Sequence, residues 1–308
     1  MKDKLIVIAG PTAAGKTALS VELAQKIGGS VISADSMQVY KYMDIGSAKI
    51  TKDEMQGIPH YLVDVLEPSE EFNISVFKKM ADEAIADIRA SGRIPIVAGG
   101  TGFYIRALAY DTKFTEEEKK DDVRGELEKV LEEKGPEYLH EMLREIDPES
   151  ADAIHPNNTK RVIRAIEYFR LNGSKISEHN KESRQKESPY DLSYFVLDMD
   201  RERLYQRIDM RVDLMMKTGL LDEVKRLKAM GYDRSYVSMQ GLGYKELLDH
   251  LDGLTTLEET VDIIKRDTRH FAKRQLTWFR SEKDAVFLPL EEYRTTEEQL
   301  EFITRHIK

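Results

Sequence analysis

The stretch that most constrains the fold is IAGPTAAGKT, at residues 8–17, where the apolar run LIVIA of residues 5–9 ends. Two glycines five positions apart, followed by Lys16 and Thr17, have the spacing of a phosphate-binding P-loop. Glycines let the backbone amides of such a loop approach phosphate oxygens, and the helix that follows directs its N-terminus at the same anion. The stretch therefore predicts a strand, a loop and a helix around a bound phosphate group.

Beyond this loop, apolar runs alternate with segments of helical spacing, which is typical of an α/β fold with a parallel sheet. The apolar runs predict further strands at residues 31–34, 61–65, 94–98 and 194–199, and helical spacing predicts helices over residues 18–27 and 77–90. From residue 201 to the end of the chain the pattern is again helical. The predicted core is thus a P-loop NTPase-like parallel sheet.

A charged and mainly helical segment interrupts this core. We expect residues 1–112 to form the first part of the P-loop core and residues 113–190 to form a helical insertion domain. Residues 191–308 would then complete the core and end in basic helices. Within the insertion, the polar run 178–189 predicts an exposed loop.

Composition narrows the class of protein. The 308 residues include no Cys, which excludes disulfides and Cys-ligated zinc. No apolar run approaches 18 residues, so we expect no membrane contact and a cytoplasmic protein. The formal net charge is -9, but residues 265–280 carry six basic residues and one acidic residue, whereas residues 116–133 carry nine acidic and four basic residues. A local basic segment is compatible with a nucleic-acid partner, although a charge run can also be a solvated helix face.

Two polar residues follow predicted strands and indicate the chemistry. P-loop NTPases usually carry a metal-binding Asp at the end of an apolar strand, yet the best such run here, residues 94–98, ends in Gly-Gly-Thr. Asp64 is a weak substitute. Asp35, by contrast, closes the strand at 31–34, and ligands of parallel sheets gather at the carboxyl ends of strands. We therefore expect Asp35 and Thr101 near the phosphate loop, with a helix cap or loop carboxylate as the alternative role for Asp35.

Seven motifs occur in order and together closely resemble the tRNA dimethylallyltransferases, also called tRNA isopentenyltransferases. The resemblance runs from about Ile6 to about Arg280 and departs from the family pattern at Ala14, where Ser is common, and at Met37, where Arg is common. The motifs are GPTAAGKT, ISADSMQVYKYMDIGSAK, IPIVAGGTGFYIRAL, IHPNNTKRVIRAIEYF, RIDMRVDLMMKTGLLDEV, GLGYKE and TRHFAKRQLTWFR.

The resemblance implies transfer of a dimethylallyl group from dimethylallyl pyrophosphate to the exocyclic N6 amine of adenosine 37 in tRNA. It implies Asp35 as the base, Thr101 as a hydrogen-bonding group and Arg211 as a pyrophosphate contact. Arg203, Arg207 and Arg211 lie four apart on one helix face, and surface ion pairs with Asp200 or Glu202 are the alternative, which we keep for Arg203. Thr17 would bind Mg²⁺ together with the pyrophosphate. The predicted pyrophosphate-binding residues are Gly10, Pro11, Thr12, Ala13, Ala14, Gly15, Lys16, Thr17 and Arg207.

The predicted partner is the anticodon stem-loop of tRNA, gripped by the helical insertion. Arg161, Arg164 and Tyr168 share one helix face, and residues 265–274 supply a second basic face, whereas Trp278 is predicted to be a packing residue. Nothing in the sequence requires a dimer, and we predict a monomer. The predicted tRNA-binding residues are Asp35, Ser36, Met37, Gln38, Thr101, Arg124, Thr159, Lys160, Arg161, Val162, Ile163, Arg164, Arg269, Lys273 and Arg274.

Three other functions compete with this one. A small-molecule P-loop kinase would leave the Gly-Gly-Thr-Gly turn and the basic C-terminal segment unexplained. An adenylate isopentenyltransferase, with free nucleotide as acceptor, would leave the basic helices without a role. A nucleotide-gated RNA-binding module would leave Asp35 without one.

Overall fold

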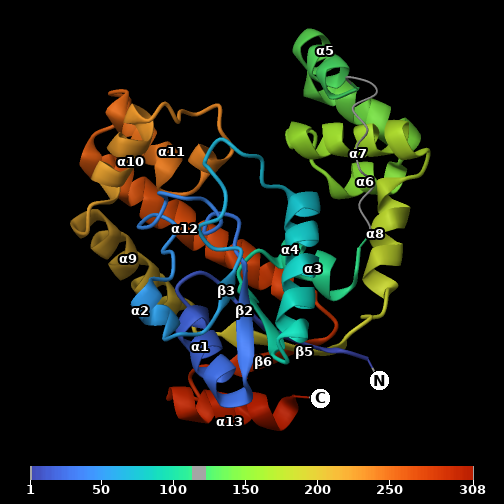
Figure 1. Cartoon of the computed structure of the whole chain (residues 1–308). Coiled ribbons are helices and arrows are strands. Elements are labelled where there is room, and N and C mark those ends of the chain that lie inside the picture. The colour runs from blue at the N-terminus through green and yellow to red at the C-terminus, as the bar shows by residue number, and fades with distance from the viewer. Residues whose placement is uncertain (1, 113–122, 308) are drawn as a thin grey trace. The chain divides into compact units, whose positions relative to one another are not determined.

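The computed structural model describes residues 2–112 and 123–307, shown in Figure 1. The chain divides into two compact units: residues 1–111 together with 188–308 form one, here called the core unit, and residues 112–187 form the other, here called the helical unit. Among the described residues, no helix is both long enough and apolar enough to cross a membrane.

The core unit is built on a parallel six-stranded sheet in the order β3-β2-β4-β1-β5-β6. Its strands are β1 (Lys4–Ala9), β2 (Gly29–Ala34), β3 (His60–Tyr61), β4 (Ile94–Gly99), β5 (Asp191–Asp198) and β6 (Ala285–Pro289). Strand β1 pairs with β4 on one side and β5 on the other, and it is buried from Leu5 to Ala9. Its continuous apolar sequence suits a parallel strand that is covered on both faces.

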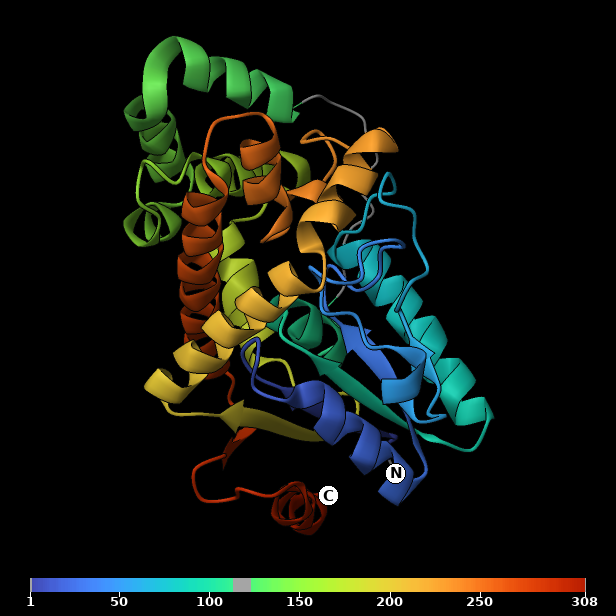
Figure 2. The same cartoon turned by 90° about the vertical axis from the view of Figure 1, so that its left-hand side faces the viewer.

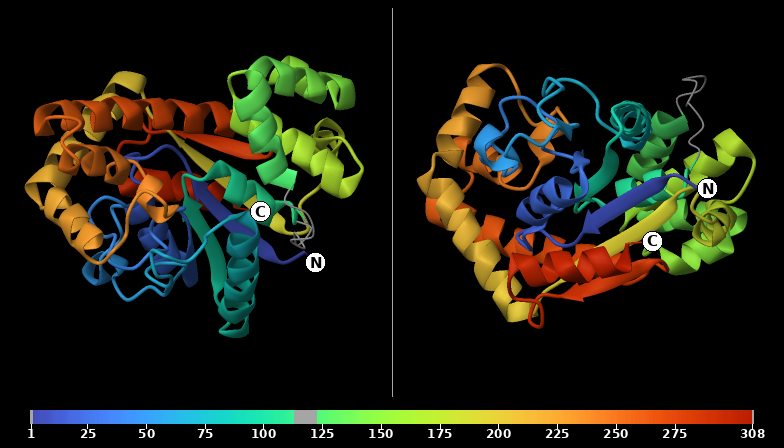
Figure 3. Two further views of the ribbon diagram at one scale, coloured as in Figure 1. Left: turned by 90° about the horizontal axis from the view of Figure 1, so that it is seen from above. Right: turned by 60° about the horizontal axis from the view of Figure 1, so that its bottom comes forward.

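Helices cover both faces of this sheet, as the views in Figures 2 and 3 show. Side chains along β1 alternate between the two cores: Leu5 and Val7 pack with α3 and α4, whereas Ile6 and Ile8 pack with α1 and α13. Helices α9 and α12 lie side by side (Figure 2). The core-unit helices are α1 (Lys16–Ile27), α2 (Lys52–Met55), α3 (Ile74–Ala90), α4 (Gly102–Ala109), α9 (Arg201–Lys217), α10 (Leu220–Ala229), the 3₁₀ turn η1 (Ser238–Gln240), α11 (Tyr244–Leu251), α12 (Leu257–Phe279) and α13 (Thr296–His306).

The helical unit contains α5 (Val123–Ile146), α6 (Pro148–Ala153), α7 (Thr159–Asn172) and α8 (Ile176–Gln185). Helix α5 is interrupted at Gly135, which has φ 82° and precedes Pro136. Leu139, Val162 and Ile166 belong to the unit's own buried cluster. The first part of the acidic run at 116–133 lies outside the described residues.

Three predicted elements were wrong. The strand expected at 61–65 ends at Tyr61, because Leu62 and Asp64 both adopt φ 60°, which no extended strand allows. The segment after residue 201 is not purely helical, since 285–289 pairs with β5 as the half-buried edge strand β6. The polar run 178–189 is not a loop throughout, because α8 continues to Gln185. Its polarity reflects exposure, which a helix tolerates as well as a loop does.

Candidate functional site

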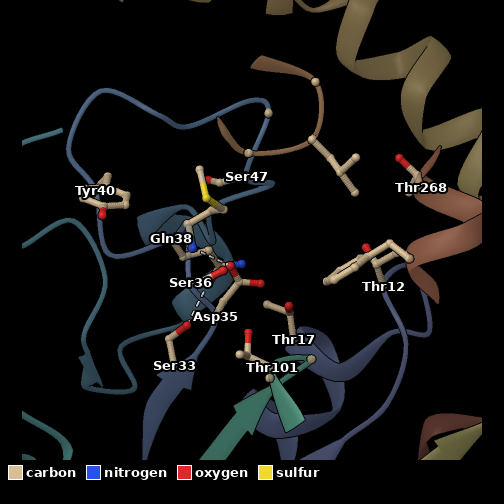
Figure 4. A pocket seen from close by; sticks show the side chains of 18 of the residues that line it. Thr12, Thr17, Ser33, Asp35, Ser36, Gln38, Tyr40, Ser47, Thr101 and Thr268 are labelled. Atoms are coloured by element: carbon tan, nitrogen blue, oxygen red, sulfur yellow. Dashed lines mark hydrogen bonds between the residues drawn. The ribbon is translucent and has the colours of Figure 1, made fainter. Parts of the chain in front are cut away.

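The carboxyl ends of β1, β2 and β4 meet around a cavity of about 510 Å³ in the core unit. The P-loop follows β1, Asp35 follows β2, and the turn of residues 99–102 follows β4. Figure 4 shows Asp35, Thr17 and Thr101 around one open space, with Thr12 across it. The predicted site residues that line this cavity are Thr12, Lys16, Thr17, Asp35, Ser36, Met37, Gln38, Thr101, Arg211 and Arg274.

The P-loop has the backbone of an anion cradle. Gly10 and Gly15 have φ 150° and 100°, and Ala13 has φ 64°, so the chain reverses its curvature within a few residues. Gly10 lies against β5, where a Cβ atom would sit 3.1 Å from Leu197 Cβ. The side chains of Pro11 and Ala14 are buried, so these residues can offer an anion only their backbone.

Lys16 begins α1, and its ammonium group is held inside this loop, where Nζ donates to Pro11 O at 2.7 Å. Removal from water lowers the pKa of Lys16 to about 8; the Asp35 carboxylate opposes this shift and the Arg211 charge adds to it. A cation that is only partly compensated in this way favours an anionic ligand.

Two arginines of α9 complete the cationic wall. Arg211 Nη1 donates to Thr12 Oγ1 at 3.4 Å, and Arg207 Nε donates to Ala13 O at 2.8 Å. Burial lowers the pKa of Arg211, against the effect of the Asp35 charge. A second hollow of about 370 Å³ is lined by Gly15, Thr17 and both arginines, among others, and of the two arginines only Arg211 also lines the larger cavity.

The third arginine on this face, Arg203, has a different role. It pairs with Glu291 at 3.7 Å and is half exposed. A surface ion pair was expected for Arg203, but its partner is Glu291 rather than the predicted Asp200 or Glu202, because the start of α9 lies beside the chain that follows β6.

Asp35 has both a local and an outward role. Its Oδ1 accepts the Met37 amide at 2.8 Å, the hydrogen bond of an Asx turn, so the loop after β2 depends on this carboxylate. The same side chain lines the cavity, beside Thr17 and Thr101 (Figure 4). A carboxylate has acceptor capacity for both tasks.

The glycines of the 99–102 turn allow close approach to other elements. A Cβ atom at Gly99 would lie 2.2 Å from Ala34 O, one at Gly100 2.3 Å from Gln275 Nε2, and one at Gly102 2.1 Å from Trp278 Cδ1. Substitution of Gly99 would displace β2, and substitution of Gly100 or Gly102 would displace the side chain of Gln275 or Trp278. Thr101, between them, caps the start of α4 with its amide bonded to Ala34 O at 3.2 Å.

Residues 38–282 match the IPP transferase family model. The chain belongs to the IPP transferase family. A tRNA dimethylallyltransferase of Lachnoclostridium phytofermentans is 57% identical over 291 residues, which are 94% of this chain and 93% of that protein.

Solved structures of the family share the fold. The tRNA isopentenylpyrophosphate transferase of Bacillus halodurans superimposes with a TM-score of 0.75 at 44% identity, covering 99% of this chain and 97% of its own. The Staphylococcus epidermidis tRNA delta(2)-isopentenylpyrophosphate transferase has a TM-score of 0.74 at 45% identity and covers 99% of both chains. A eukaryotic dimethylallyltransferase acting on tRNA has a TM-score of 0.82 at 33% identity, covering 99% of this chain and 80% of its own. The predicted P-loop NTPase-like α/β core and the family resemblance are both confirmed.

Two buried polar residues of this IPP transferase were missed by the sequence analysis. Gln275 of α12 is 7% exposed; Oε1 accepts the Thr12 amide at 2.9 Å and Nε2 donates to Gly100 O at 2.9 Å. Glu223 of α10 accepts the amides of residues 44–46 at 2.9, 2.8 and 3.1 Å, which holds the loop of the cavity wall. Each polar side chain stands on an otherwise apolar helix face, the one sequence signal that could have revealed it.

The predicted tRNA-binding residues of the helical unit fall into two groups. The side chains of Val162 and Ile163 are buried in the unit's core, so the predicted tRNA contact of these two residues would have to come from their backbone. Arg164 and Arg124 remain about half exposed while pairing with Glu167 at 3.1 and 2.9 Å. Lys160 and Arg161 are exposed and Thr159 is half-buried, all on α7.

The basic face of α12 is also divided. Arg269 forms an ion pair with Asp209 of α9, and Lys265 forms one with Asp213. The guanidinium of Arg269 is therefore engaged by another helix of the core unit. Lys273 and Arg274 are exposed, and Arg274 lies 5.8 Å from the Phe271 ring centroid. Trp278 packs as predicted, with Arg106 5.0 Å from its ring centroid.

The residues of the site that could hold a metal are few. The described parts of the chain contain no cluster of three His, Cys, Asp or Glu side chains that could bind one. Thr17, in the first turn of α1, lines both hollows beside the P-loop. A hydroxyl at this place fits a divalent cation that takes most of its other ligands from water and a bound phosphate.

Proposed function

We propose that this chain transfers a dimethylallyl group from dimethylallyl pyrophosphate to the exocyclic N6 amine of adenosine 37 in tRNA and releases pyrophosphate. The observation that carries the proposal is one cavity lined by two cations and a carboxylate. The cations are Lys16 and Arg211, and the carboxylate is that of Asp35 at the end of β2. The names of the relatives, a tRNA dimethylallyltransferase and a dimethylallyltransferase acting on tRNA, support the same reaction.

The cationic wall would stabilise the leaving group. When the allylic C–O bond breaks, negative charge grows on the pyrophosphate oxygens, and preorganised cations and amides lower the energy of that state. Lys16, Arg211 and the P-loop amides would receive it, with Arg207 at the outer edge. Thr17 would hold Mg²⁺ against the same oxygens, where the ion supplies further positive charge.

Asp35 would serve the acceptor. The adenine amine is a weak nucleophile because its lone pair is delocalised into the ring, so a base that takes its proton during attack accelerates the reaction. Thr101 would donate a hydrogen bond to the leaving group or position the amine. A base in an anticodon loop has to leave its stack to reach such a pocket, and 510 Å³ lies within the size range of ligand pockets.

A direct assay separates this function from its rivals. The protein is incubated with labelled dimethylallyl pyrophosphate and either tRNA or AMP. We expect label in tRNA and none in AMP, without ATP consumption. Label in AMP would indicate an adenylate isopentenyltransferase, and stoichiometric ATP hydrolysis would indicate a kinase.

Replacing Arg211 with alanine should mainly weaken use of the prenyl donor. Arg211 lines both hollows, whereas Arg207 lines only the outer one, so we expect a rise of roughly tenfold or more in the donor KM for Arg211→Ala and a smaller one for Arg207→Ala. Steady-state kinetics at saturating tRNA measure both. If the donor KM of Arg211→Ala equals that of wild type, the pyrophosphate contact would be assigned to Arg207 instead.

Binding of tRNA should weaken as salt rises, despite the net charge of -9. Lys273 and Arg274 are exposed on α12, so the double variant Lys273→Ala, Arg274→Ala should reduce the slope of log K against log salt by about 0.7–0.9 for each lost phosphate contact. Arg269→Ala is the matched comparison, because its guanidinium is engaged by Asp209. That variant should lower the melting temperature and leave the salt slope nearly unchanged; an equal loss of slope in both variants would contradict this assignment.

A further inference from the structure

Gln275 joins two loops that line the cavity, the P-loop and the 99–102 turn. It comes from α12, far along the chain from both, and its side chain is almost fully buried. Its carboxamide accepts the Thr12 amide at 2.9 Å and donates to Gly100 O at 2.9 Å. One planar group thus bonds the P-loop after β1 and the 99–102 turn after β4.

The bridge has little freedom to move. A Cβ atom at Gly100 would lie 2.3 Å from Gln275 Nε2, which shows how closely the amide is seated on the turn. The other end is held at Thr12, whose hydroxyl also accepts a hydrogen bond from Arg211. The planar carboxamide of Gln offers an acceptor and a strong donor on one rigid group, and Asn, which has the same group, is shorter by a methylene.

The residues next to each anchor belong to different halves of the reaction. Thr12 lies in the loop of Lys16 and Thr17, which would hold the pyrophosphate, and Gly100 precedes Thr101, which lies beside Asp35 in the cavity wall (Figure 4). The distance between these loops therefore sets how near the donor carbon lies to the acceptor amine. A reaction between two bound groups depends steeply on that distance.

We propose that Gln275 is a positioning residue that fixes the P-loop against the 99–102 turn and so keeps the donor carbon within reach of the amine. This inference rests on the proposed function. If the amine is out of reach when the allylic C–O bond breaks, water attacks the same carbon instead. Its oxygen forms the new C–O bond, its proton passes to solvent, and the products are dimethylallyl alcohol and pyrophosphate.

The test is the ratio of pyrophosphate released to tRNA prenylated, with labelled dimethylallyl pyrophosphate and tRNA. Wild type should give a ratio near one. Gln275→Met, similar in size but unable to donate or accept at these places, should lower the kcat of transfer by roughly 10²-fold and raise the ratio several-fold. Gln299→Met is the matched control, because the Gln299 side chain of α13 donates to Tyr293 O, away from the cavity, and it should keep the wild-type ratio.

Gly100→Ala tests the same contact from the other side. Its methyl group would push the Gln275 amide away while leaving the glutamine in the chain. We expect a raised ratio in this variant and no further rise when it is combined with Gln275→Met. The ratio measured for Gly100→Ala alone carries the test if Gln275→Met does not fold.

Two results have separate meanings. If wild type forms no prenylated tRNA, the proposed function fails. If wild type prenylates tRNA and the variants lose transfer and pyrophosphate release in equal proportion, Gln275 has only a structural role and the positioning proposal is overturned.

Discussion

Replacing Asp35 with asparagine will abolish most prenyl transfer while tRNA still binds. The side chain keeps its size, and an asparagine Oδ1 can still accept the Met37 amide that holds the loop after β2. What is lost is the capacity to take a proton from the adenine amine. We expect kcat to fall by about 10²–10⁴ and the Kd for tRNA to change by less than roughly threefold.

The asparagine variant separates catalysis from loop geometry, which Asp35→Ala cannot do. Asp35→Ala removes the base and the Asx turn together, so it should lower the melting temperature as well as kcat. Asp200→Asn provides a control, since Asp200 Oδ1 caps α9 through the Glu202 amide at 2.9 Å and asparagine caps equally well. Near-normal kcat in Asp35→Asn would show that this carboxylate is structural, and the base would have to be sought elsewhere in the cavity.

Replacing Lys16 with methionine should disable use of the donor without destabilising the protein. Loss of one preorganised cation at the leaving group lowers catalysis by roughly 10²–10³ in kcat/KM for the donor. Lys16→Arg is the charge-preserving comparison and should retain more activity. A binding measurement with inorganic pyrophosphate, independent of tRNA, should show the same order of the variants.

Although Lys16→Met should lose activity, its thermal stability should be equal to or higher than that of wild type. The pKa of Lys16 in the folded protein is about 8, below its ordinary value of 10.5, so folding disfavours the ammonium form. That cost is fully present below pH 8 and is relieved as the pH rises toward 10.5. At neutral pH the melting temperature of Lys16→Met should therefore equal or exceed that of wild type, and the difference should shrink above pH 8. A large drop in melting temperature would mean that the Lys16–Pro11 hydrogen bond is needed to hold the empty loop.

The sequence by itself determined the features that depend on neighbouring residues. The glycine spacing at 10–15 requires backbone angles that the structure shows, φ 150° and 100°, and the helix begins at Lys16. The continuous apolar run before it, followed by the glycine loop, indicated a buried parallel strand, which is β1. Asp35 and Thr101 were placed at the same sheet edge for the same reason, because in a parallel sheet every strand ends on that side.

Only the tertiary structure decided which side chains meet across the chain. Gln275 forms hydrogen bonds with Thr12, in the loop after β1, and with Gly100, in the turn after β4. Both are remote from it in sequence, so no local pattern could assign these partners. The α9 arginines are equivalent by spacing, yet packing turns Arg211 into the cavity and leaves Arg203 beside Glu291. Likewise part of the basic face of α12 is neutralised by its neighbour, because Arg269 and Lys265 form ion pairs with Asp209 and Asp213 of α9. Charge along one helix is a property of sequence, but its neutralisation depends on the helix packed against it.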